Sequence, residues 1–100
     1  MGKYKVRMLP AAADDLEDVI AYLNTLSPQA AAAYYDAIVA QIGKLRELPE
    51  RFPLARDEQL RIKGYRIMPV KCYLVFYVVR EKIVLIKGIM YKMSNYTSVL

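Results

Sequence analysis

The sequence predicts an α+β domain in which a helical hairpin packs on a mainly antiparallel sheet, in the order β-α-α-β-β-β. Three apolar segments, Ile62–Met68, Cys72–Val79 and Ile83–Met90, follow one another with breaks of only three residues. Such short breaks leave room for hairpin connections alone, so consecutive strands must be antiparallel. Upstream of them, two stretches repeat apolar residues every three or four positions, which is typical of amphipathic helices.

The first strand and the first helix come before residue 27. Tyr4–Met8 alternates apolar and basic residues, as a half-exposed strand does. Pro10 suits the first turn of a helix, and we expect that helix over Ala11–Leu26. Four acids near its start are interpreted as solvated groups that favour the positive end of the helix dipole. They are Asp14, Asp15, Glu17 and Asp18, and the expected buried stripe is Leu16, Val19, Ile20, Leu23 and Leu26.

A second helix is predicted from Pro28 to about Leu48, with Ser27 as its N-cap and Pro49 as its end. Because almost no loop separates the two helices, they must fold back as an antiparallel hairpin that covers one face of the sheet. The expected buried stripe of this helix is Tyr35, Ile38, Val39, Ile42, Leu45 and Leu48.

The remaining segments complete one domain, residues 1–100. Glu50–Leu60 is predicted to be a solvated connection with Phe52 and Leu54 tucked beneath it. Cys72–Val79 is apolar or aromatic throughout, which predicts a central strand covered on both faces. The tail from Tyr91 to Leu100 has no clear period.

Composition excludes several classes of protein. The chain has no histidine and a single cysteine, Cys72, so zinc sites, imidazole catalysis and an internal disulfide are excluded. We therefore expect no cofactor. No apolar run reaches the ~20 residues that span a bilayer, and the charged N-terminus does not resemble a secretion signal. The expected location is the cytoplasm, with no membrane partner.

The charge is distributed unevenly between the two halves of the chain. Residues 1–50 carry a net −2, whereas residues 51–100 carry ten Lys/Arg and three Asp/Glu, a net +7. A basic half of this kind indicates a polyanion or an acidic protein partner. The alternative is that lysines keep the edge strands soluble and unpaired.

Basic residues and tyrosines are the chemical groups that the predicted strands offer. Lysine and arginine hold phosphates and tyrosine rings stack on unpaired bases, so RNA is a suitable ligand. Tyrosine could also move protons if adjacent cations lowered its pKa of about 10. Tyr35, Tyr65, Tyr73 and Tyr77 are instead expected in the core. The candidate nucleic-acid-binding residues are Arg61, Lys63, Lys71 and Lys87.

Several segments in this order resemble the RelE/ParE superfamily, the toxins of bacterial type II toxin–antitoxin modules. They are LRELPERFPLARDE, GYRIMPVKCYLVFYVV and IVLIKGIMYKMSNYTSVL, of which Gly64-Tyr65-Arg66 followed by Tyr73-LVFY is the most specific. The resemblance covers essentially the whole chain. It implies a cognate antitoxin, expected to bind DNA and to carry an acidic tail, and it allows a homodimer.

The resemblance implies two targets. RelE-like members cut messenger RNA on the ribosome, and ParE-like members poison DNA gyrase without a nuclease site. The positions that match the catalytic set of the nuclease branch are Arg66, Tyr91, Lys92 and Tyr96. Met68 and Leu74 stand where that branch usually carries further cations.

Three hypotheses follow. The first is growth inhibition by metal-independent, ribosome-dependent mRNA cleavage, in which Arg66 stabilises the phosphate, Lys92 binds the backbone, and Tyr91 or Tyr96 positions the base or the 2′-OH. The second is a non-enzymatic gyrase poison, and a module with either kind of toxin would be of the plasmid-stabilisation type. The third is a decayed toxin that retains only antitoxin binding.

Overall fold

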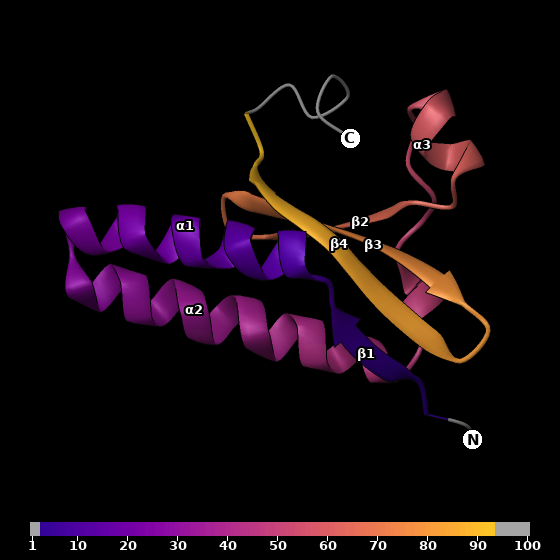
Figure 1. Ribbon diagram of the computed structural model, residues 1–100, viewed down its shortest axis with the longest axis horizontal. Coiled ribbons are helices and arrows are strands. Elements are labelled where there is room, and N and C mark those ends of the chain that lie inside the picture. The colour runs from indigo at the N-terminus through magenta and orange to yellow at the C-terminus, as the bar shows by residue number, and fades with distance from the viewer. Residues whose placement is uncertain (1–2, 94–100) are drawn as a thin grey trace.

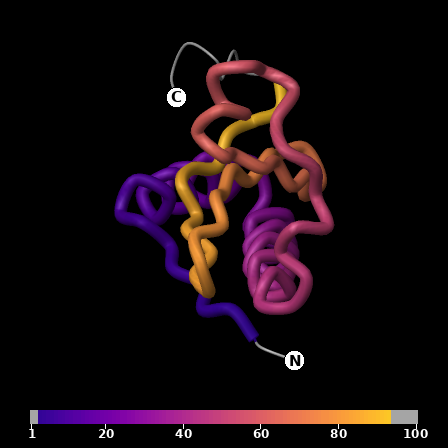
Figure 2. The backbone as a smooth tube through the Cα atoms, turned by 90° about the vertical axis from the view of Figure 1, so that its right-hand side faces the viewer, coloured from indigo at the N-terminus to yellow at the C-terminus, as the bar shows by residue number. Residues whose placement is uncertain are grey.

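A computed structural model describes residues 3–93 of the chain. The elements are β1 (Lys5–Met8), α1 (Pro10–Leu26), α2 (Pro28–Gly43), α3 (Glu58–Ile62), β2 (Arg66–Val70), β3 (Tyr73–Arg80) and β4 (Ile83–Tyr91), with short 3-10 turns η1 (Lys44–Arg46) and η2 (Pro49–Arg51) after α2. α1 and α2 lie side by side as an antiparallel hairpin, and α3 lies far from β1 (Figures 1 and 2). No helix within these residues is long and apolar enough to cross a membrane.

The four strands form one mixed sheet in the order β1-β4-β3-β2. β2, β3 and β4 pair antiparallel, so the predicted hairpin-linked meander is confirmed. β1 pairs parallel with β4, with Lys5 opposite Ile83. The predicted α+β order is therefore confirmed, and its one parallel pair joins the first strand to the last.

β3 is covered on both faces, as its continuous apolar sequence predicted. Tyr73, Val75 and Tyr77 face the helix hairpin and belong to the larger core cluster. Phe76 and Val78 face the other way, and belong to a second cluster that the segment around α3 covers. Because side chains from both of its faces are buried, β3 is the central strand of the core.

The predicted buried stripe of the second helix is confirmed at Ile38, Ile42 and Leu45 but is wrong at three other positions. Tyr34, not Tyr35, packs against the core, and Tyr35 is 47% exposed. α2 also ends at Gly43 rather than near Leu48, which is 74% exposed. Adjacent helical residues point about 100° apart, so the two neighbouring tyrosines cannot share the buried face. The other expected stripe members that are exposed are Val39 in α2 and Leu26 in α1.

The segment before β2 is partly helical, which corrects the predicted solvated loop and the predicted strand start at Ile62. Asp57 caps α3, since its Oδ2 accepts a hydrogen bond from the Leu60 N–H at 3.1 Å. Ile62 is the last residue of α3, and β2 begins only at Arg66. β2 then continues through Pro69, which an edge strand tolerates because one row of its N–H groups faces outward.

One of the four acids of α1 has a specific structural role. Asp15 is only partly exposed, and its Oδ2 accepts a hydrogen bond from the Ile89 N–H at 3.0 Å. Ile89 follows an irregularity in the β3–β4 pairing, where Lys87 is an extra residue between the Tyr77–Ile86 and Phe76–Gly88 pairs. Asp15 thus satisfies a donor beside the bulge and ties α1 to β4.

Candidate functional site

Arg66 lies at the start of β2, on the face that carries the helices. Its Nη1 donates to the Phe52 carbonyl at 2.7 Å and to the Glu50 carbonyl at 3.4 Å, and its Nη2 lies 4.0 Å from the Glu50 carboxylate. Only 18% of its side chain is exposed. The guanidinium expected to hold a phosphate therefore holds the backbone of the segment around η2.

Tyr77 holds the same segment through a hydrogen bond. Its side chain is fully buried, and its hydroxyl donates to the Pro49 carbonyl at 2.5 Å. Burial raises the pKa of Tyr77 to about 12, although the nearby Arg66 and Arg51 lower it in part. A phenol with a raised pKa stays protonated, so Tyr77 is a permanent hydrogen-bond donor near neutral pH.

Three tyrosines form a cluster at the other end of β3, referred to below as the tyrosine cluster. The rings of Tyr34 and Tyr73 meet edge to face at 5.9 Å, and those of Tyr73 and Tyr91 at 5.7 Å. The Tyr34 hydroxyl lies 3.6 Å from Cys72 Sγ, and that contact is the main cause of the raised pKa of Tyr34. Burial is the main cause of the raised pKa of Tyr73. Tyr91, which the sequence placed in a periodless tail, is the last residue of β4.

One predicted cation contacts this tyrosine cluster through its side chain, and a second is held next to it by its backbone. Lys71 Nζ lies 5.4 Å from the centre of the Tyr34 ring, and the Lys92 backbone N–H donates to the Cys72 carbonyl at 2.9 Å. The cluster opens into a pocket of about 580 Å³ between the sheet and α1. Its lining residues are Asp18, Val19, Tyr22, Leu23, Tyr34, Cys72, Tyr73 and Tyr91.

The other predicted cations lie on the α3 side of the sheet. Lys87 Nζ is 5.9 Å from the centre of the Tyr65 ring. Arg61 and Lys63 are exposed at the end of α3, where Arg61 Nη1 donates to the Arg56 carbonyl at 2.9 Å. The four candidate nucleic-acid-binding residues are therefore divided between two sites, with Lys71 apart from the other three.

The structure does not bring the candidate catalytic residues together. Arg66 is paired with Tyr77, and Tyr91 with Tyr73, which lies four residues before Tyr77 in β3. At about 3.3 Å per residue, these positions are roughly 13 Å apart along the strand. Tyr91 and Lys92 are adjacent, and Tyr96 lies outside the described residues.

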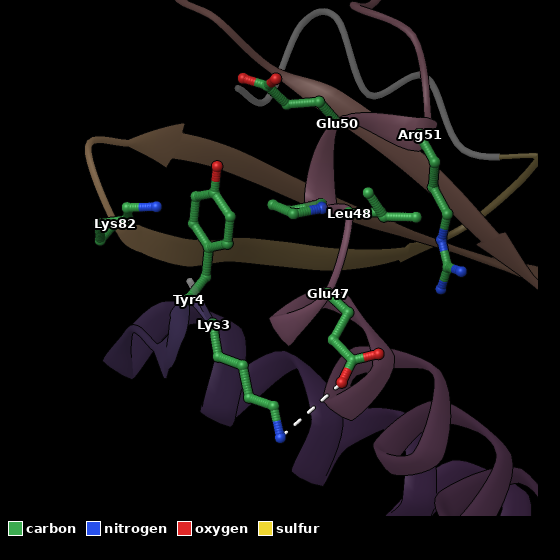
Figure 3. Close-up of a pocket in the computed structure, with 8 residues that line it drawn as sticks. Lys3, Tyr4, Glu47, Leu48, Glu50, Arg51 and Lys82 are labelled. Carbon is green, nitrogen blue, oxygen red and sulfur yellow. Dashed lines mark ion pairs between the residues drawn. The ribbon is translucent and has the colours of Figure 1, made fainter. Parts of the chain in front are cut away.

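A further pocket, of about 860 Å³, escaped the sequence analysis (Figure 3). Leu48 stands in it with a left-handed backbone, φ 54° and ψ 54°, a conformation that costs a non-glycine residue on the order of 1 kcal/mol. Pro49 already indicates a non-helical backbone at Leu48, because a residue before proline is disfavoured in the right-handed α region. The predicted second helix should therefore end before Leu48.

One family model matches most of the chain, and two solved structures share its fold. A family model described as the ParE toxin of the type II toxin–antitoxin system parDE matches residues 6–96. The chromosomal ParDE system from P. aeruginosa is similar in structure, with a TM-score of 0.75 and 20% identity over 89% of this chain and 96% of that one. The RelBE2 toxin–antitoxin complex from Mycobacterium tuberculosis gives a TM-score of 0.58 and 25% identity over 89% and 98%. A comparison with curated proteins found no match.

Proposed function

Because this chain belongs to the ParE toxin family of type II toxin–antitoxin systems, we propose that it inhibits growth by binding a protein target, DNA gyrase, and not by cutting RNA. The observation that carries this choice is the position of Arg66. Its guanidinium is engaged by the carbonyls of Phe52 and Glu50 on the helix side of β2. A phosphate would have to displace those contacts before Arg66 could stabilise a cleavage step.

Three tyrosines outside the predicted catalytic set are also poorly suited to take over proton transfer. General acid–base catalysis is most efficient when the pKa of the catalytic group lies near the working pH. The pKa values of Tyr34 and Tyr73 are raised above the ordinary value, and that of Tyr77 is raised to about 12. These phenols are therefore less suited to proton transfer than a free tyrosine.

The tyrosine cluster has the character of a protein-binding surface. Its member Tyr91 is 49% exposed, and Tyr22, which lines the same pocket, is 60% exposed. Met93, two residues after Tyr91, is 75% exposed. Tyrosine and methionine are enriched at protein interfaces, and tyrosine is among the residues that most often dominate binding energy. With Lys71 and Lys92 beside the cluster, an aromatic and cationic surface is available to a protein partner.

A cognate antitoxin is the second partner we propose. Both similar structures are toxin–antitoxin systems, and the net +7 of residues 51–100 suits an acidic segment. A partly disordered acidic tail that folds on this surface would combine charge neutralisation with apolar burial.

Two assays on the purified chain test the target. We expect inhibition of gyrase supercoiling with accumulation of cleaved DNA, and intact messenger RNA in a translating extract. Tyr91→Ala should weaken gyrase inhibition at least about tenfold if the ring is an interface anchor. The control Ile62→Ala, at an apolar residue of α3 that is 76% exposed, should have no effect.

Two outcomes would replace the proposal. Shortened messenger RNA with gyrase unaffected would establish ribosome-dependent cleavage instead. Normal growth on expression without antitoxin, with gyrase and messenger RNA both unaffected, would mean that only antitoxin binding is retained.

A further inference from the structure

The pocket beside Leu48 lies between three segments that are distant in the sequence. Backbone hydrogen bonds fix its walls: the Tyr4 N–H donates to the Arg46 carbonyl, and the Lys5 N–H to the Lys82 carbonyl, each at 2.9 Å. The start of β1 is thereby held against both the end of η1 and the β3–β4 hairpin. The pocket is lined by Lys3, Tyr4, Glu47, Leu48, Pro49, Glu50, Arg51 and Lys82.

The acidic residues of this pocket have ion-pair partners, whereas two of its basic residues do not. Glu47 is 3.9 Å from Lys3 Nζ, and Glu50 is 4.0 Å from Arg66 Nη2. Arg51 and Lys82 have no carboxylate partner among residues 3–93, and their charged groups lie near the rings of Phe52 and Tyr4 instead. Two cations are therefore free to pair with incoming carboxylates.

These two cations stand on opposite sides of an apolar centre. Figure 3 shows Lys82 beside Tyr4 on one side and Arg51 on the other, with Leu48 between them. Lys82 Nζ is 5.0 Å from the centre of the Tyr4 ring. The pocket thus offers an apolar surface bounded by a positive charge at each end.

Leu48 is held in the pocket at a conformational cost. Glycine would adopt the same left-handed backbone without strain, yet this position carries a leucine that is 74% exposed. The contacts of Tyr77 and Arg66 with the carbonyls of Pro49 and Phe52 fix the segment that follows. Strained residues that the surrounding structure enforces are concentrated at functional sites.

We propose that this pocket binds an acidic segment of a protein partner. An apolar side chain of that segment would pack over Tyr4 and Leu48, while carboxylates on either side of it would pair with Lys82 and Arg51. A continuous phosphate backbone suits the pocket less well, because it offers no apolar side chain to pack over Tyr4 and Leu48. A small molecule would stay half solvated, since most of the lining residues are exposed.

Nuclear magnetic resonance of the isotope-labelled full chain tests this with defined probes. The acidic probe is the capped peptide Ser-Glu-Leu-Glu-Ser, compared with Ser-Glu-Ser-Glu-Ser, Ser-Lys-Leu-Lys-Ser and a polyuridine decamer. The acidic probe with leucine should shift the resonances of Tyr4, Leu48 and Lys82 most. Absence of these shifts at millimolar probe, equal shifts from the probe without leucine, or stronger shifts there from polyuridine would overturn the proposal.

Two variants separate binding from folding. Leu48→Gly should keep or raise the melting temperature, because it relieves the left-handed strain, and should weaken binding of the acidic probe about tenfold through lost apolar contact. Lys82→Glu should also weaken that probe and should gain affinity for the lysine probe. Ile62→Ala is the control with unchanged binding. Equal affinities of Leu48→Gly and Ile62→Ala for the acidic probe would refute the assignment.

Discussion

Replacing Tyr77 with phenylalanine would remove one hydrogen bond from a fully buried position. The Tyr77 hydroxyl donates to the Pro49 carbonyl, and both residues are buried. A buried acceptor that loses its donor costs about 1–3 kcal/mol. Since 1 kcal/mol shifts the melting temperature of a domain of this size by about 4–8 °C, we expect Tyr77→Phe to melt about 4–24 °C lower.

The same variant has a characteristic pH dependence. Burial raises the pKa of Tyr77 to about 12 in the folded protein, whereas an unfolded tyrosine titrates near 10. A raised folded pKa means that the stabilisation is fully present below pH 10 and is lost as the pH rises through 12. Phenylalanine does not titrate, so the stability difference between the wild type and Tyr77→Phe should narrow from pH 10 upward.

Urea unfolding followed by circular dichroism measures both effects. Stabilities at pH 8 and at pH 10.5 and 11 are compared for the wild type, Tyr77→Phe and the control Tyr35→Phe, whose ring is 47% exposed. The control should stay within about 0.5 kcal/mol of the wild type. A Tyr77→Phe variant as stable as the control at pH 8, or a difference that widens with pH, would refute the reasoning.

Two further predictions concern the helix register and Arg66. Ile38→Ala should destabilise the fold by about 2–5 kcal/mol because Ile38 is fully buried, whereas its neighbour Val39, 42% exposed, should tolerate alanine within about 0.5–1 kcal/mol. Similar losses in denaturant titrations of the two variants would contradict the register. Arg66→Ala should cost about 1–2 kcal/mol through the lost contact with the Phe52 carbonyl, and Arg66→Lys should lie between it and the wild type. A fully stable Arg66→Ala variant would leave the residue free for another role.

The boundaries of the elements were predicted well where the determinant is local. Ser27 caps α2, and its Oγ accepts the Ala30 N–H at 3.2 Å as the Ser-Pro pair predicted. The core tyrosines were predicted less well: Tyr65, Tyr73 and Tyr77 are buried, but Tyr35 is not. Tyr34 and Tyr35 have the same chemistry, and only packing against Tyr73 selects the first.

The missed helix α3 has a related explanation. Asp57 is a good N-cap residue, but a five-residue helix has too few periodic positions to stand out from a polar loop. It forms because Leu60 is buried beneath it with Ala55, Tyr65 and Phe76. That second cluster exists only once β3 presents Phe76 to the far side of the sheet.

The sequence by itself determined the order and type of the main elements, because apolar periodicity, proline and capping residues act over a few neighbouring positions. Only the tertiary structure decided what the polar side chains do. It paired β1 with β4, turned Arg66 toward the carbonyls of Glu50 and Phe52, and left Lys82 and Arg51 beside an exposed Leu48. The physical reason is that a long cationic side chain donates to whichever acceptor the folded chain brings within about 3 Å. That acceptor can lie far away in the sequence.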